Sequence, residues 1–255
     1  MDQNTDVDRS AAPLSNPERA AADFSFAFQP IVDLETAEVV AHEALVRGAS
    51  GESAGDVLGS IRPESRHLFD EACRHRALDI AARLGMQGAL HINCSTVTPE
   101  RLEATLASTR EAAEDVGIDP GRVVLEFSRL EPLGSPRELD RVRQVANQAG
   151  FEVLADNFGA SEVGMKRLVV FQPQWLKLDR NLVQRIHCSE RRKALVSGLL
   201  ATCRLLNIDV IAGGIEEPEE LEWMKSAGVR YAQGYLLARP TFESVPRFDP
   251  ARLAV

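Results

Sequence analysis

The feature that most constrains the fold of this chain is a repeated alternation of short apolar segments with longer amphipathic ones. The first two apolar segments, FSFAFQPIVDL and VVAHEALVRG, are separated only by the tight turn ETAE, which predicts an antiparallel hairpin. After the hairpin, stretches with helical periodicity alternate with short segments typical of strands. The expected strands are GALHIN, RVVLEFS, FEVLADNF, QWLKLD, IDVIAGG and VRYAQGYLLARP. The expected helices span residues 64–84, 99–116, 136–149, 162–169, 191–206 and 218–227.

This alternation predicts a parallel sheet, because parallel neighbours need a crossover connection that is usually helical. The strands that follow the first one bring the total close to a complete eightfold barrel. The sequence therefore predicts an α/β fold, a TIM-like (β/α)8 barrel, and a length of 255 residues suits one such domain. A doubly wound open sheet is the alternative, but no GxGxxG follows the first strand.

The first residues differ from the rest of the chain. Residues 1–22 are polar, contain two prolines and show no periodicity, so we expect a flexible tail before a barrel domain over residues 23–255. No stretch approaches the roughly 18 apolar residues that a membrane-spanning helix needs. The N-terminus also lacks a basic region followed by an apolar one. A cytoplasmic protein without membrane contact is expected.

The charge of the chain limits the partners it can have. Asp and Glu number 38 against 29 Lys and Arg, which gives a net charge of −9 and argues against general nucleic-acid binding. The net charge does not exclude an anionic ligand, because a local pocket or a metal ion can make the electrostatic potential at the binding site positive. The four cysteines form no CxxC, and the five histidines form no HxxxH or HExxH. These patterns argue against a zinc site.

Polar residues stand near the ends of successive predicted strands. In a barrel of this kind, these ends converge on one mouth, where the chemistry takes place. The residues are Glu43, Asn93, Glu126, Asp156, Lys177 and Gln233. Carboxylate and amide oxygens suit Mg²⁺, Mn²⁺ or Ca²⁺. Any one of these residues alone would more often be a helix cap or a surface residue. The pattern therefore leaves two interpretations open, a metal or anion site and a set of unrelated caps and surface residues.

These segments resemble a known family, the EAL domain, a bacterial phosphodiesterase module that hydrolyses cyclic di-GMP to the linear dinucleotide. The opening FQPIVDLETAEVVAHEALVRG is similar to the start of that domain. HINCS resembles its VNLS strand, VVLEFS its LEIT segment, and LADNFGAS its LDDFGTG motif. LKLDR, IAGGIE and AQGYLLARP resemble LKIDR, IAEGVE and VQGYLFGRP. The similarity runs in order from about residue 24 to residue 240.

The resemblance implies a (β/α)8 barrel whose first strand runs antiparallel to the others. It also implies two Mg²⁺ or Mn²⁺ ions that activate water for attack on a phosphodiester. The positions that match metal ligands are Glu43, Asn93, Glu126 and Asp156. Lys177 matches the lysine that holds the attacking water, so Lys177 and Glu43 are the expected catalytic residues. The expected substrate-binding residues are Gln29, Arg47, Asp179, Arg180 and Gln233.

The chain departs from the family pattern at positions that bear on chemistry. Asn157 replaces the second aspartate of the Asp-Asp pair, which weakens the second metal site because its oxygen is neutral. Gly213 replaces the first glutamate of EGVE, while Glu216, the second one, is retained. Arg129 replaces a glutamate that steadies the loop after the pair, and that loop itself, residues 160–165, is altered.

The expected function is that of a degenerate EAL domain in cyclic di-GMP signalling. It would be impaired in catalysis and act by binding the nucleotide or a protein partner, with Mg²⁺ or Mn²⁺ at one weak site or at none. The alternatives are an active phosphodiesterase that forms linear pGpG and an interaction module that binds no nucleotide. A homodimer through residues 163–171 is a further expectation, against the alternative that Leu168, Val169 and Val170 pack on the barrel.

Overall fold

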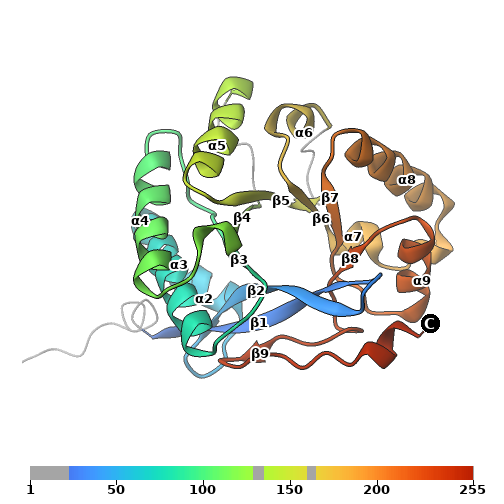
Figure 1. Ribbon diagram of the computed structural model, residues 1–255, viewed down its shortest axis with the longest axis horizontal. Helices are drawn as coiled ribbons and strands as arrows, with labels where there is room; N and C mark the ends of the chain where they lie inside the picture. Colours follow the sequence, from blue (N-terminus) through green and yellow to red (C-terminus); the bar gives the residue numbers. More distant parts are fainter. Residues whose placement is uncertain (1–22, 129–134, 160–164, 255) are drawn as a thin grey trace, which may run out of the picture.

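The computed structural model describes residues 23–128, 135–159 and 165–254, which form a ring of strands with helices on its outside (Figure 1). The predicted tail at residues 1–22, Arg129 and residues 160–164 of the altered loop lie outside the described residues. The predicted α/β barrel is confirmed.

The first strand closes the barrel by pairing on both of its sides. Within the described residues the barrel strands are β1 (Phe24–Asp33), β2 (Glu38–Gly48), β3 (Ala89–Asn93), β4 (Val123–Phe127), β5 (Glu152–Phe158), β6 (Trp175–Leu178), β7 (Asp209–Ala212) and β8 (Tyr231–Ala232). Neighbours from β2 to β8 are parallel. β1 is antiparallel to β2 over ten residue pairs and to β8 over two. The short strand β9 (Thr241–Phe242) also pairs with β1.

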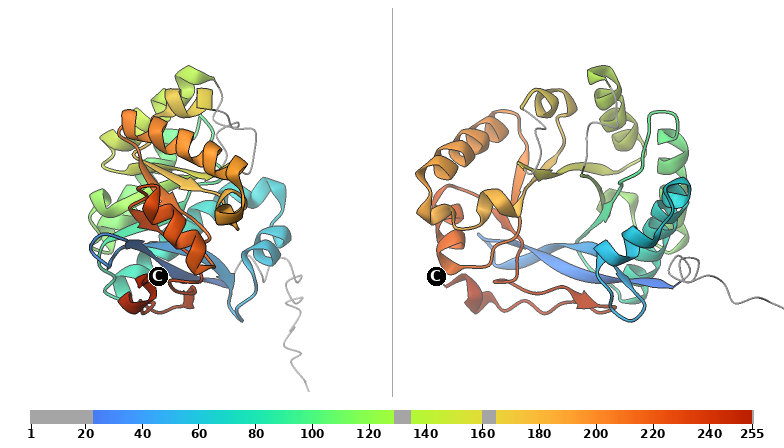
Figure 2. Two further views of the ribbon diagram at one scale, coloured as in Figure 1. Left: turned by 90° about the vertical axis from the view of Figure 1, so that its right-hand side faces the viewer. Right: turned by 180° about the vertical axis from the view of Figure 1, so that it is seen from behind.

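The helices surround the barrel, as the views in Figure 2 show. They are α2 (Ala54–Ser60), α3 (Arg66–Arg83), α4 (Leu102–Asp115), α5 (Pro136–Gln148), α6 (Met165–Phe171), α7 (Arg180–Val183), α8 (Glu190–Leu205) and α9 (Pro218–Ser226). The helix expected from residue 99 begins three residues later, because the Arg101 amide donates to the Thr98 carbonyl in a preceding turn. None of the helices in the described ranges is long and apolar enough to span a membrane.

The barrel interior is apolar at its centre and polar at one end. The buried residues at its centre are Ile31, Ala41, Val124, Leu154 and Ile211. Successive side chains of a strand point to opposite sides, so residues two positions further on in the parallel strands, and two positions earlier in the antiparallel β1, face the same interior. Toward the mouth these positions are Gln29, Glu43, Glu126, Asp156 and Gly213. The polar residues singled out from the sequence therefore lie in one layer above an apolar floor.

The segment expected to support a dimer packs mainly on the barrel. In α6, Leu168 and Phe171 are buried, whereas Val169 is 48% exposed. Val170 is partly buried against the same core. This packing agrees with the alternative expectation for Leu168 and in part for Val170, whereas Val169 is about half exposed and does not pack as that expectation required.

Asp33 links the hairpin turn to the start of the neighbouring strand β8. Its Oδ1 accepts from the amide of Glu35 at 2.9 Å, and its Oδ2 lies 2.7 Å from Nη2 of Arg230, the residue before β8. Burial by itself would raise the pKa of Asp33, but the hydrogen bonds from Arg230 and from the turn amides outweigh it and lower that pKa. The ionised carboxylate therefore stabilises the closure of β1 against β8.

We expect Asp33→Asn to lower the free energy of unfolding by about 1–2 kcal/mol at pH 7, because a charge-assisted acceptor becomes neutral. The folded-state pKa of Asp33 lies below the value of 3.8 for the free side chain. The Asp33 contribution is therefore present above pH 3.8 and is lost as the pH falls through the folded-state pKa, so the two proteins converge in acid. Urea unfolding from pH 7 to pH 3 measures this difference.

The control for Asp33→Asn is Glu35→Gln, at a side chain that is 71% exposed and lies near the same arginine. It should lower the free energy of unfolding by less than about 0.5 kcal/mol. An equal loss in both variants would contradict the assignment.

Candidate active site

Three carboxylates surround one ammonium at the mouth of the barrel. Nζ of Lys177 lies 2.8 Å from Oε1 of Glu126, 3.1 Å from Oε1 of Glu43 and 3.7 Å from Oδ1 of Asp156. The four side chains come from β2, β4, β5 and β6 and are at most 10% exposed. We refer to Glu43, Glu126, Asp156 and Lys177 as the carboxylate–lysine cluster.

Two further side chains fix the carboxylates of this cluster. Nε2 of Gln233 donates to Oε2 of Glu43 at 2.8 Å. Nδ1 of His91 lies 3.0 Å from Oε1 of Glu126. Burial lowers the pKa of His91 to about 3, so its ring is neutral at pH 7 and has one N–H to donate. Gln233 was expected at the site, whereas His91 was not.

A second set of contacts lies beside the cluster at the ends of β3, β4 and β5. The Ser128 hydroxyl lies 3.2 Å from Oδ2 of Asp156 and 3.4 Å from Oδ1 of Asn93. Nδ2 of Asn157 donates to the same Oδ2 of Asp156 at 2.6 Å. Asn157 thus acts in this arrangement as a hydrogen-bond donor to Asp156.

The electrostatics of the cluster favour a bound cation. Burial raises the pKa of Glu43, and the nearby Glu126 raises it further. Burial also raises the pKa of Glu126. Burial alone would lower the pKa of Lys177, but Glu126, Glu43 and Asp156 outweigh it and raise that pKa. Lys177 is therefore charged at neutral pH, and the three carboxyl groups exceed its charge by two when all are ionised.

The residues present fit a hard divalent ion by their chemistry. The oxygens of Glu43, Asn93, Glu126 and Asp156 are the donors that Mg²⁺ and Mn²⁺ prefer. The charge excess of the cluster equals the charge of one such ion. In the part of the chain that the structure describes, however, no three His, Cys, Asp or Glu side chains are arranged so that they could bind one metal ion together. The three carboxylates instead surround the Lys177 ammonium.

Comparison of the sequence with models of known protein families identifies the family of this chain. The family model described as "EAL domain" matches residues 16–240, which is most of the chain. The chain belongs to the EAL domain family.

Two solved structures, one of them described as an EAL protein, are similar over about nine-tenths of this chain. A standalone versatile EAL protein from Vibrio cholerae, in its cyclic di-GMP bound form, has a TM-score of 0.84 and 36% identity, and the match covers 90% of this chain and 97% of that one. Klebsiella pneumoniae BlrP1, in complex with calcium and cyclic di-GMP, has a TM-score of 0.82 and 30% identity, and the match covers 93% of this chain and 60% of that one.

Curated relatives are more distant and longer. The Escherichia coli blue light- and temperature-regulated antirepressor BluF is 27% identical over 228 residues, which is 87% of this chain and 55% of BluF. The probable cyclic di-GMP phosphodiesterase PdeN of the same organism is 26% identical over 230 residues, which is 85% of this chain and 43% of PdeN. The chain spans about half the length of these relatives.

Position 213 of this EAL domain lies beside the lysine of the cluster. A Cβ atom at Gly213 would stand 3.3 Å from Cγ of Lys177 and 2.7 Å from the carbonyl oxygen of Leu178. Glu216, the retained glutamate of the same motif, instead pairs with the exposed Arg180 at 2.7 Å. Glu216 therefore does not replace the missing carboxylate beside Lys177.

The five expected substrate-binding residues of the EAL domain do not all lie free at the mouth. Gln29 is buried and donates to the Ala238 carbonyl at 3.0 Å. Asp179 accepts from the Asn181 amide at the start of α7, and Arg180 makes the ion pair with Glu216. Gln233 is bound to Glu43. The structure places these four residues in contacts within the protein.

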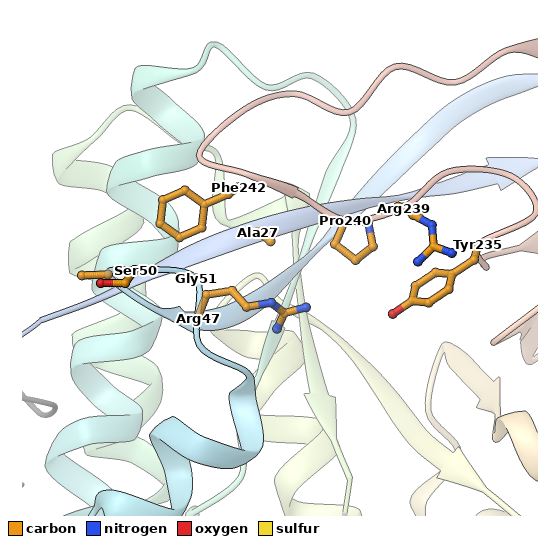
Figure 3. A pocket seen from close by; sticks show the side chains of 9 residues that line it. Ala27, Arg47, Ser50, Gly51, Tyr235, Arg239, Pro240 and Phe242 are labelled. Atoms are coloured by element: carbon orange, nitrogen blue, oxygen red, sulfur yellow. The ribbon is translucent and has the colours of Figure 1, made fainter.

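Arg47 lines a pocket of about 590 Å³ at the rim of the EAL barrel. Figure 3 shows its guanidinium extending toward the side where Tyr235 and Arg239 lie. Arg239 stacks over the Tyr235 ring, with Cζ 4.5 Å from the centroid. Phe242 contributes a second aromatic ring to the lining. The pocket thus combines two guanidinium groups with two aromatic faces.

Proposed function

We propose that this EAL domain binds cyclic di-GMP together with one divalent ion and that it hydrolyses the nucleotide inefficiently. One observation carries the proposal: the positions of two expected carboxylates hold Asn157, whose amide donates to Asp156, and Gly213, which has no side chain. The remaining oxygen donors carry a charge excess suited to one Mg²⁺ or Mn²⁺. Glu43, Asn93, Glu126 and Asp156 would hold this ion, which would polarise a phosphate oxygen.

Two metal ions stabilise both the attacking and the leaving oxygen in a two-metal hydrolysis. A site that lacks the anionic donors for the second ion loses part of this stabilisation, which costs orders of magnitude in rate. Lys177 would still orient a water molecule through its ammonium. The protein can therefore bind cyclic di-GMP while hydrolysing it only slowly.

Two features support cyclic di-GMP as the ligand: the composition of the pocket that Arg47 lines and the ligands of the similar solved structures. Guanidinium groups form paired hydrogen bonds with phosphates, and aromatic rings stack on bases. Arg47, Arg239, Tyr235 and Phe242 supply both kinds of group. The Vibrio cholerae protein and BlrP1 were both solved with cyclic di-GMP. We propose that the protein acts in the cytoplasm, where nucleotide binding would be transmitted to a protein partner or a second copy of the chain.

An active phosphodiesterase is the second candidate. It is favoured by one observation, the assembly of Glu43, Glu126 and Asp156 around Lys177. Calorimetric titration with cyclic di-GMP, followed by chromatography of the reaction with Mg²⁺ or Mn²⁺, separates the two. We expect saturable binding with little linear product. Rapid formation of linear product would favour the active enzyme, and the absence of binding would favour an interaction module without nucleotide.

We expect Arg47→Ala to weaken cyclic di-GMP binding by about tenfold or more, or about 1.4 kcal/mol, because a phosphate loses a charge-assisted contact. Calorimetric titration of the intact chain measures the change. Arg110→Ala, at a half-exposed arginine on α4 that pairs with Glu114, is the matched control and should leave the affinity unchanged. Equal affinity of Arg47→Ala and the native protein would remove Arg47 from the site.

A further inference from the structure

A histidine lies inside the barrel directly below the carboxylate–lysine cluster. His91 stands on β3, two residues before Asn93, and is 1% exposed. In the parallel register it pairs with Glu43 of β2 on one side and with Val124 of β4 on the other. Its position is therefore between the apolar centre of the barrel and the cluster.

His91 contacts the carboxylate oxygen that also contacts the lysine. Its Nδ1 is 3.0 Å from Oε1 of Glu126, and Nζ of Lys177 is 2.8 Å from the same oxygen. Glu126 is completely buried, so water does not compete for this contact. In the tautomer that carries its proton on Nδ1, His91 gives this oxygen a second donor, which fixes the rotation of the carboxylate, and Oε2 faces Lys177 at 3.1 Å.

The His91 ring also makes an edge contact with an aromatic ring. The ring packs edge-on against Trp175, with centroids 6.3 Å apart. Trp175 is held by a bond from its Nε1 to Oε2 of Glu152 at 2.5 Å and by the Tyr231 ring at 5.0 Å. The imidazole therefore contacts both the Trp175 ring and the carboxylate of Glu126, toward which its Nδ1 points.

We propose that His91 is a positioning residue that limits the rotation of Glu126 and so prepares this carboxylate as a ligand of the divalent ion. This inference rests on the proposed function, in which Glu126 is a ligand of that ion. A hydrogen bond to a metal-binding carboxylate restricts its rotation before the metal binds, so less conformational entropy is lost on binding. The same bond also changes the basicity of the carboxylate. His91 acts through Glu126 and does not touch the ion. A space-filling role alone would require only an apolar side chain of similar size at this position.

The test compares the Mn²⁺ affinity of the full chain with its stability. Electron paramagnetic resonance of free Mn²⁺ gives the dissociation constant, and thermal melting in EDTA gives the stability without metal. We expect His91→Leu to raise the Mn²⁺ dissociation constant about 10- to 100-fold. His91→Asn, whose amide can donate from near the Nδ1 position, should restore the affinity to within about threefold of the native value. His91→Val repeats the measurement if the leucine variant does not fold.

His42→Leu is the matched control, because His42 is also buried and stands on neighbouring β2. Within the described residues its ring nitrogens make no hydrogen bond to a side chain; the polar group near them is the Gln87 backbone, outside the carboxylate–lysine cluster. This variant should keep the native Mn²⁺ affinity. Equal affinities for native protein and His91→Leu would overturn the positioning role and leave the proposed function intact. If the native protein itself binds no Mn²⁺, the metal part of the proposed function fails and this inference fails with it.

Discussion

Replacing Lys177 with methionine should lower the free energy of unfolding by about 3–5 kcal/mol in the absence of divalent ions. The reason is that Glu43 and Glu126 would remain buried without the ammonium that they contact. Denaturant unfolding at pH 7 in EDTA measures the loss. Adding Mn²⁺ should raise the melting temperature of the variant more than that of the native protein, because a cation would replace the missing charge.

Lys193→Met is the control for this experiment. Lys193 pairs with Glu190, which is 87% exposed, so its removal should cost less than about 1 kcal/mol. A loss for Lys177→Met no larger than that of the control would show that the cluster does not depend on its lysine. A variant that gains no stability from Mn²⁺ would argue against the carboxylates as ligands.

Restoring both missing carboxylates, through Gly213→Glu together with Asn157→Asp, should raise hydrolysis of cyclic di-GMP about a hundredfold or more. Glu43, Asn93, Glu126, Asp156 and Lys177 already supply the other groups. Each single change should recover less than the pair, because groups that act on one catalytic centre are strongly non-additive. Product formation with Mn²⁺, followed by chromatography, measures the effect.

The structure also indicates the steric cost of this experiment. The backbone of Gly213 does not lie in the left-handed region, so a side chain causes no strain there through φ. A Cβ at position 213 would nevertheless stand 2.7 Å from the Leu178 carbonyl oxygen, and the ends of β6 and β7 would have to separate. Asn157 has a φ of 54°, a conformation that aspartate also tolerates.

Gly213→Ala isolates the steric part, because it adds the Cβ without the carboxylate. We expect it to destabilise the protein by about 1–3 kcal/mol and to leave turnover low. If the double variant folds, binds cyclic di-GMP and still shows no turnover, Asn157 and Gly213 are not the inactivating positions. The defect would then lie in Arg129 and the loop at residues 160–165.

The sequence was sufficient to predict the layer of polar residues at the mouth. Glu43, Glu126 and Asp156 each follow an apolar segment, and the parallel arrangement of their strands brings such ends together. The alternation of strands and helices fixed their order around the barrel. Periodicity therefore predicts which residues share one end of the barrel, and in the structure Lys177 lies within 3.7 Å of all three carboxylates.

The contacts between the residues of this layer could not be predicted in the same way. His91 and Ser128 reach Glu126 and Asp156 from neighbouring strands, and such contacts depend on the register and on side-chain rotation. Nothing in the sequence spacing distinguishes His91 from an ordinary buried residue. The length of β8 also differs from the prediction. The segment VRYAQGYLLARP was expected to form the last strand, but only its residues Tyr231 and Ala232 form β8.

The unequal pairing of β1 has a consequence for the order in which the chain assembles. β1 and β2 are adjacent in sequence and form ten residue pairs, whereas β1 and β8 lie some 200 residues apart and form only two. Joining distant segments requires a large loss of chain entropy before any contact compensates for it, so closure at β8 is the late step. Gln233, just after β8, reaches over this junction to Glu43 of β2. A nascent chain synthesised only as far as residue 205 would thus contain six of the eight barrel strands and still lack the Gln233 that completes the site.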